Sequence, residues 1–178
     1  MFTQQLPSGV FATQREFIRV MEANRDFVWW AESLITEETK ELKEAYEAEV
    51  QDMDNIFKEI ADLIYVVCGF YNTMPTFAPE ILTEEKNQEL QQILDEAAVL
   101  LSTVAHELKI PLPLMVAAFE IVHQSNMSKL GEDGKSIRRE DGKILKGPNY
   151  TPPSMAAVVK EWQKVVKNIA AKGVLGNA

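Results

Sequence analysis

The sequence contains few of the residues from which disulfide frameworks are built. Cys68 is the single cysteine among 178 residues, and only two histidines are present. One cysteine excludes an intrachain disulfide, and the apolar residues around Cys68 predict a buried thiol. We therefore expect a reducing, cytoplasmic environment for this protein.

Long apolar runs and an excess of basic residues are also missing. No stretch approaches the roughly 18 consecutive apolar residues of a membrane span, and residues 1–9 lack the pattern of a signal peptide. The chain has 18 Lys and Arg residues against 27 Asp and Glu residues, which gives a net charge of −9. Nucleic acids and membrane surfaces favour a basic face, so we expect neither as a partner.

Apolar residues recur at steps of three and four along most of the chain, which predicts an all-α fold. No linker or repeat divides the sequence, so we expect one domain over residues 1–178. Asp26 and Thr83 precede two of the periodic segments and are expected to act as N-caps. The expected helices cover about residues 12–23, 26–50, 56–72, 83–108 and 113–129, with a last helix capped by Ser154.

The segment from Ser128 to Pro153 has no helical periodicity, and such a long loop in a compact domain is unusual. Asp141-Gly142 within it predicts the turn of a short β-hairpin. Six basic and four acidic residues lie between Lys129 and Tyr150, so the loop is locally basic. It is expected either to bind a compact anion or to be a solvated surface loop.

Two acidic pairs occupy positions where apolar residues are expected. Glu38 and Glu41 continue a stripe that contains Phe27, Trp30, Ala31, Leu34, Ala45 and Ala48. Asp62, three residues after Glu59, is the one exception in an otherwise apolar or aromatic run from Ile60 to Tyr71. An ionised carboxylate in such a place is costly unless a cation or strong donors compensate it.

Residues three apart lie on one face of a helix, so each pair can chelate an ion. If the two helices form an antiparallel hairpin, the pairs can face one another across it. Few basic residues lie nearby in the sequence, and oxygen ligands without His or Cys favour Mg²⁺, with Mn²⁺ as the alternative. The competing interpretation is that these acids form salt bridges on exposed faces. A di-iron carboxylate bundle is a weaker alternative, because Glu120-x-x-His123 is the one Glu-x-x-His step; His123 is then an orienting or structural residue.

The residues of both acidic pairs, and a later polar run, resemble the all-α nucleoside triphosphate pyrophosphohydrolases. The first motif is Glu37-Glu38-x-x-Glu41, followed after seventeen residues by Glu59-x-x-Asp62. A second run, from His123 to Leu130 with Ser-Asn-Met-Ser-Lys at its centre, is similar to a MazG-like branch labelled phosphoribosyl-ATP pyrophosphohydrolase-like. The segment from about 73 to 105 departs from compact members and is interpreted as a helical insertion.

The resemblance implies a MazG-like helical bundle that hydrolyses a nucleoside triphosphate between its α and β phosphates. Metal ligands would be Glu38, Glu41, Glu59 and Asp62, with Glu37 as a further ligand or as the base that orients water. Lys129 would stabilise charge on the leaving pyrophosphate beside Asn126. A lid over the phosphates would contain Lys143, Lys146 and Tyr150. The resemblance also implies a homodimer or tetramer.

The sequence leaves the nucleotide open. A (d)NTP is the first candidate, with phosphoribosyl-ATP or dUTP as alternatives within the same chemistry and a non-catalytic helical interaction module as an alternative of another class. Phe27, Trp29 and Trp30 could stack on a base, although aromatic residues at helical spacing are more often part of a core.

Overall fold

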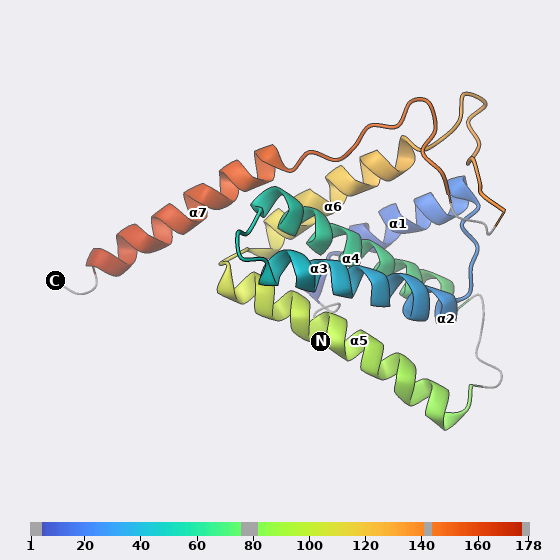
Figure 1. Cartoon of the computed structure of the whole chain (residues 1–178), viewed down its shortest axis with the longest axis horizontal. Helices are drawn as coiled ribbons and strands as arrows, with labels where there is room; N and C mark the ends of the chain where they lie inside the picture. Colours follow the sequence, from blue (N-terminus) through green and yellow to red (C-terminus); the bar gives the residue numbers. More distant parts are fainter. Residues whose placement is uncertain (1–4, 76–81, 141–143, 176–178) are drawn as a thin grey trace.

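The computed structural model describes residues 5–75, 82–140 and 144–175, with side chains as far as residue 172. The described residues form helices joined by loops, which confirms the predicted all-α fold (Figure 1). The helices are α1 (Ser8–Met21), α2 (Phe27–Trp29), the π-helix η2 (Trp30–Ile35), α3 (Thr36–Glu47), α4 (Met53–Thr73), α5 (Glu84–Glu107), α6 (Leu112–Met127) and α7 (Ala156–Leu175).

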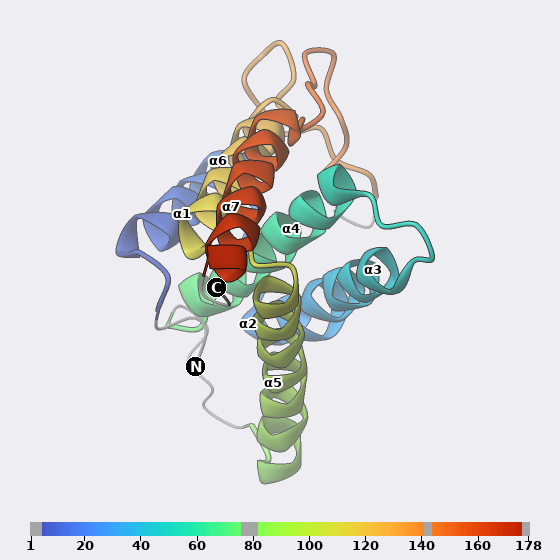
Figure 2. The same cartoon turned by 90° about the vertical axis from the view of Figure 1, so that its left-hand side faces the viewer.

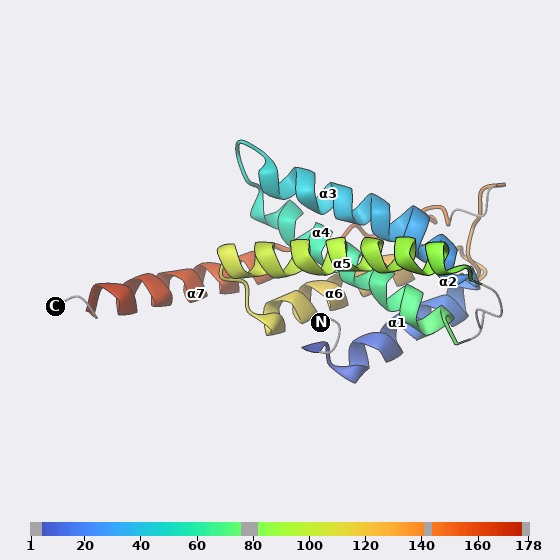
Figure 3. The same ribbon diagram turned by 90° about the horizontal axis from the view of Figure 1, so that it is seen from below.

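Helix α4 is the centre of the structure because its sequence is apolar on almost every side. Fourteen of its 21 residues are buried, among them Cys68, whose buried position was predicted. Helices α1 and α6 pack on one side of α4 and α3 on the other, and α5 lies along α3 and η2 (Figures 2 and 3). The α7 helix contacts α4 and α6 near its start and then projects from the body (Figure 1).

The segments α2, η2 and α3 form one continuous helical rod whose phase shifts in the middle. A π-helix closes its hydrogen bonds over five residues rather than four, as in the bond from the Thr36 amide to the Ala31 carbonyl. Ile35 is consequently fully buried, whereas Leu34 is only half-buried. Leu34 still packs partly against the core, as the predicted stripe expects, but the stripe did not contain Ile35. It was wrong at Ala48, which follows the end of α3 and is exposed.

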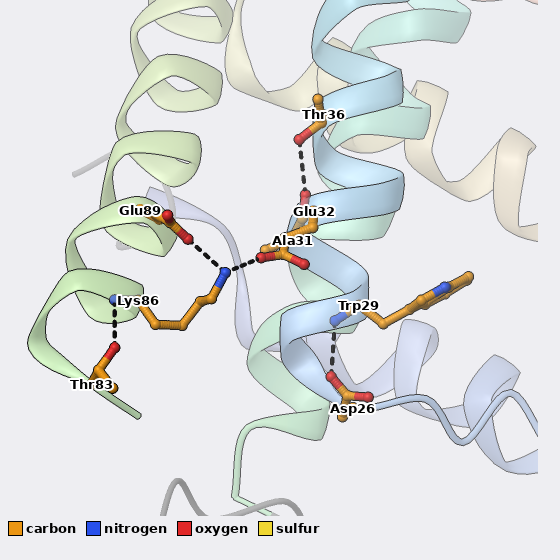
Figure 4. A network of polar contacts seen from close by, with 8 residues as sticks. All are labelled: Asp26, Trp29, Ala31, Glu32, Thr36, Thr83, Lys86 and Glu89. Atoms are coloured by element: carbon orange, nitrogen blue, oxygen red, sulfur yellow. Dashed lines mark hydrogen bonds and ion pairs between the residues drawn. The ribbon is translucent and has the colours of Figure 1, made fainter. Parts of the chain in front are cut away.

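Two predicted N-caps are present (Figure 4). The Asp26 carboxylate accepts a hydrogen bond from the Trp29 amide at 2.9 Å, and the Thr83 hydroxyl accepts one from the Lys86 amide at 3.1 Å. The Lys86 ammonium also bridges Glu89 on its own helix, at 2.5 Å, and Glu32 on η2, at 2.6 Å. These exposed ion pairs orient α5 against η2 and contribute little to stability.

The aperiodic segment before α7 contains two isolated antiparallel bridges, Leu130 with Ser136 and Arg138 with Ile144. The second bridge encloses the predicted hairpin turn, whose residues 141–143 lie outside the described part. Gly147 packs so closely on the end of α6 that a Cβ there would lie 2.5 Å from the Leu130 carbonyl oxygen. The last helix begins at Ala156, two residues after the predicted cap Ser154.

No single helix among the described residues is long and apolar enough to cross a membrane. One bent pair, α5 with α6, passes that test only when the two helices are taken together, at an angle of 118°.

The packing of Trp30 on Gly69 predicts a matched pair of stability effects. A Cβ at Gly69 would lie 2.4 Å from the Trp30 ring, so Gly69→Ala should lower the free energy of unfolding by about 1–3 kcal/mol. Gly9→Ala, in the first turn of α1 and with no described atom within 4 Å of the added methyl, should instead raise it by at most about 0.5–1 kcal/mol. Urea unfolding of both variants measures the difference; equal effects would contradict the close packing of Trp30 on α4.

Candidate metal and nucleotide site

Three carboxylates from two helices converge where α3 packs on α4. One oxygen from each of Glu38, Glu41 and Glu59 lies within 4.8 Å of the others. The first two belong to α3, and Glu59 projects from α4, the next helix along the chain. Asp62 lies one turn beyond Glu59 but is not part of this group of three oxygens.

The surroundings of Glu38 disfavour the ionised form of its carboxyl group. Burial raises the pKa of its carboxyl group to about 8, and the carboxylates of Asp62, Glu41 and Glu59 add to the effect, opposed by Lys58. Its Oε2 atom is buried and makes no hydrogen bond within the described residues. Burial also raises the pKa of Glu59, which is 5% exposed, against the lowering effect of Lys58.

These observations fit a hard divalent cation. The donor set consists of carboxylate oxygens, one of them buried without a hydrogen-bond partner among the described residues, and the neighbouring carboxylates raise the pKa of Glu38. Mg²⁺ and Mn²⁺ prefer such oxygen ligands. A cation bound among Glu38, Glu41 and Glu59 would offset both the desolvation and the repulsion.

Lys58 is a member of the cluster that the sequence analysis missed. Its ammonium lies 3.0 Å from both carboxylate oxygens of Glu59 and 2.9 Å from Oδ2 of Asp62. The expectation that few basic residues lie nearby was therefore wrong at this position. The spacing held a signal, because a lysine four residues before an aspartate can pair with it along a helix.

A cavity of about 460 Å³ opens beside the carboxylates. Its lining contains Glu37, Glu38 and Asp62 from the acidic motifs together with Asn126 and Lys129 from the end of α6. Segments more than sixty residues apart in sequence thus meet in one hollow. Glu41 and Glu59 line an adjoining depression between the end of α3 and the start of α4.

Hydrogen bonds link Asn126 and Lys129 to the core. The Lys129 ammonium donates to Oδ1 of Asn126 at 2.6 Å, and Asn126 is hydrogen-bonded to the Tyr65 hydroxyl. That hydroxyl lies 3.0 Å from Nδ1 of His123, whose pKa is lowered by burial. Tyr65 and His123 therefore orient Asn126 from beneath, in agreement with the structural role expected for His123.

The three aromatic residues considered for base stacking occupy different environments. Phe27 and Trp30 are buried in the core, where Phe27 packs edge-on against Phe70. Trp29 is half-buried and lines the cavity, and the Arg25 guanidinium lies 5.2 Å from its ring centroid. Trp29 is the aromatic residue of this set whose exposed surface could meet a ligand.

The proposed lid residues are not part of the described cavity lining. The Lys146 ammonium lies 4.7 Å from the ring centroid of Tyr150, and Lys143 lies outside the described residues. Instead, the hairpin contributes Arg138 and Ile144 to the cavity. Sequence analysis counted Arg138 only as part of the local basic excess, because nothing in an aperiodic loop indicates which side chains face inward.

The pKa of Glu38 predicts a proton-coupled metal affinity. Below about pH 8 its carboxyl group is protonated, so a divalent ion must displace that proton to bind. The association constant for Mn²⁺ should rise by up to about tenfold per pH unit from about pH 6 to about pH 8 and then level off. Titration calorimetry in buffers of different ionisation enthalpy measures the released proton. Glu38→Gln should bind more weakly and lose this pH dependence, and a pH-independent affinity of the unmodified protein would contradict the assignment.

Comparison with known proteins gives one family match. Residues 15–76 match the family model of phosphoribosyl-ATP pyrophosphohydrolase, and this segment contains Glu37 and all four proposed metal ligands. Neither the curated proteins nor the solved structures give a match to the chain. The matched segment ends before α5 and before Asn126 and Lys129. Residues 15–76 are thus similar to phosphoribosyl-ATP pyrophosphohydrolases, which agrees with the resemblance of the acidic motifs to the all-α pyrophosphohydrolase superfamily.

Proposed function

We propose that the protein is a Mg²⁺-dependent nucleoside triphosphate pyrophosphohydrolase. It would cleave a (d)NTP between the α and β phosphates and release a (d)NMP and pyrophosphate. The observation that carries the proposal is the convergence of Glu38, Glu41 and Glu59 within 4.8 Å beside a cavity that also contains Asn126 and Lys129. Carboxylates that can bind a metal ion and the Lys129 ammonium that can bind phosphate thus lie close together. A triphosphate complexed with Mg²⁺ requires both.

The ligands would be Glu38, Glu41 and Glu59, with Asp62 completing the set. A divalent ion there supplies Lewis acidity, which polarises a phosphate and lowers the pKa of a bound water. Glu37 is exposed and lines the cavity beside Glu38, so it can accept a proton from the attacking water as a general base.

The leaving pyrophosphate requires positive charge on its side of the scissile bond. Lys129 lines the same cavity as Glu37, Glu38 and Asp62, and its ammonium donates to Oδ1 of Asn126 at 2.6 Å. A fixed ammonium stabilises the charge that develops on the leaving group without needing to reorient during the reaction. Tyr65 and His123 support this arrangement through Asn126.

The base would lie at the far end of the cavity from the carboxylates. A volume of about 460 Å³ falls within the roughly 300–1,000 Å³ of small-molecule sites. Trp29 offers an indole surface for stacking, and Leu34 and Ile144 supply apolar contacts beside it. We assign the recognition of the base to Trp29 and leave Phe27 and Trp30 to the core.

Phosphoribosyl-ATP is the second candidate substrate, because the matching family model carries that name. It contains the same α–β anhydride, so the roles of the carboxylates and of Lys129 would be unchanged. A common (d)NTP has no phosphoribosyl group on its base, so the two substrates differ in the space they need around the base. A direct comparison of turnover therefore separates the two substrates.

The homodimer or tetramer stays a prediction, and so does the assignment of residues 73–105 as an insertion. Helix α5 occupies most of that segment and lies beyond the residues that match the family model. Light scattering of the purified protein measures the number of subunits.

Turnover of NTPs, dNTPs and phosphoribosyl-ATP with Mg²⁺ tests the proposal. Pyrophosphate should be the product, and EDTA should abolish its release. Glu41→Gln removes a ligand and should lower kcat/KM by at least the roughly 10–100-fold that loss of an outer-shell partner costs. Glu47→Gln is the matched control, because Glu47 is exposed on the same helix and pairs with Lys43 at 4.0 Å. Orthophosphate as the product, or full turnover by Glu41→Gln, would contradict the proposal.

A further inference from the structure

The Lys58 ammonium forms ion pairs with Glu59 and Asp62, two of the proposed ligands of the divalent ion. Its ammonium contacts both oxygens of Glu59 at 3.0 Å and one oxygen of Asp62 at 2.9 Å. An ammonium has three N–H donors, so these three acceptors account for its full capacity. The side chain of Glu59 is only 7% exposed, and Lys58 is the cation nearest to it in the described contacts.

Glu59 belongs to both arrangements. One of its oxygens lies within 4.8 Å of oxygens from Glu38 and Glu41, while both of its oxygens accept from Lys58. A bound Mg²⁺ or Mn²⁺ lies about 2.0–2.2 Å from its oxygen ligands, so it and the ammonium would be two like charges within a few ångströms. The two cations therefore compete for the same carboxylates.

The geometry of Lys58 allows it to leave. Its side chain is 37% exposed, in contrast to that of Glu59, and lysine carries its charge on a flexible four-carbon stem. Rotation of the stem can move the ammonium toward solvent while α4 stays in place. Glu59 and Glu38 cannot make a comparable movement, because Glu59 is buried and Glu38 is packed at the α3–α4 contact.

We propose that Lys58 is a tethered cation that neutralises Glu59 and Asp62 until a divalent ion displaces it, and that this competition sets the metal affinity. The inference rests on the proposed metal site. Lys58 is thus a positioning residue, which keeps the acidic side chains together in the folded protein. It also weakens the binding of free metal, because a divalent ion must compete with the ammonium for the carboxylates.

Titration calorimetry with Mn²⁺ at pH 8, without nucleotide, tests the inference. Lys58→Met keeps most of the length of the unbranched side chain and removes its charge. It should bind Mn²⁺ about tenfold tighter or more, the scale expected when a unit charge a few ångströms away is removed near a protein surface. Its melting temperature without metal should fall, because Glu59 and Asp62 lose their counter-ion, and Mn²⁺ should raise it by more than in the unmodified protein.

Three further variants separate charge competition from other causes. Lys164→Met removes the same charge from an exposed pair with Glu161 on α7 and should leave the affinity within about twofold. Lys58→Arg keeps the charge and should not bind Mn²⁺ more tightly. Lys58→Gln, which can still donate to Glu59, should show the gain in affinity even if Lys58→Met fails to fold.

The failures of the two proposals are distinguishable. If the unmodified protein binds Mn²⁺ and neither neutral variant at position 58 binds it more tightly, the tethered-cation role is overturned and the metal site stands. An equal gain in Lys58→Arg would also overturn it, because the cause would then be steric. If no variant binds Mn²⁺ at all, the metal site itself is overturned, and the role of Lys58 with it.

Discussion

The repulsion among four carboxylates at the α3–α4 contact is the constraint on which the rest of the site depends. Glu38, Glu41, Glu59 and Asp62 lie where two helices pack, and burial there raises the pKa values of Glu38 and Glu59. A folded protein must offset this cost locally. It does so by keeping the Glu38 carboxyl group protonated below about pH 8 and by placing the Lys58 ammonium against Glu59 and Asp62. Both devices can be reversed, which is what a site for a divalent ion requires.

The surrounding scaffold makes this arrangement rigid. Trp30 packs on Gly69 so closely that no side chain fits between them, which fixes the start of the α2–α3 rod near the C-terminal end of α4. The π-helix then rotates the rod so that Ile35 and Leu42 face the core, with Glu38 between them. On the other side of α4, Tyr65 and His123 hold the end of α6, and with it Asn126 and Lys129, at the same cavity. The acidic and basic sides of the site are thus set by one central helix.

Sequence periodicity was sufficient for the parts of the fold that depend on local pattern. The apolar run of α4 predicted a helix covered on most sides, and Asp26 and Thr83 were predicted as N-caps from residue type and position alone. The π-helix could not be predicted, because its hydrogen bonds span five residues and leave no mark in a pattern read at 3.6 residues per turn. Burial of Ile35 in place of Leu34 follows directly from it.

The candidate site was predicted unevenly for a similar reason. The acidic pairs were predicted because carboxylates interrupt apolar stripes. The role of Lys58 was missed, although its position four residues before Asp62 indicates an ion pair along the helix. Arg138 and Ile144 reach the cavity because of the way the hairpin crosses the end of α6. At this crossing Gly147 lies against the backbone of Lys129 and Leu130. Such a tertiary path has no local sequence signature.

Anomalous X-ray scattering from crystals of the protein soaked in Mn²⁺ would locate a bound ion. We expect a manganese peak bounded by the carboxylates of Glu38, Glu41 and Glu59, with the Lys58 ammonium moved away from Glu59. A peak elsewhere, or no peak with Lys58 still bound to Glu59 and Asp62 at saturating Mn²⁺, would show that the acidic cluster is a salt-bridged packing contact and not a metal site.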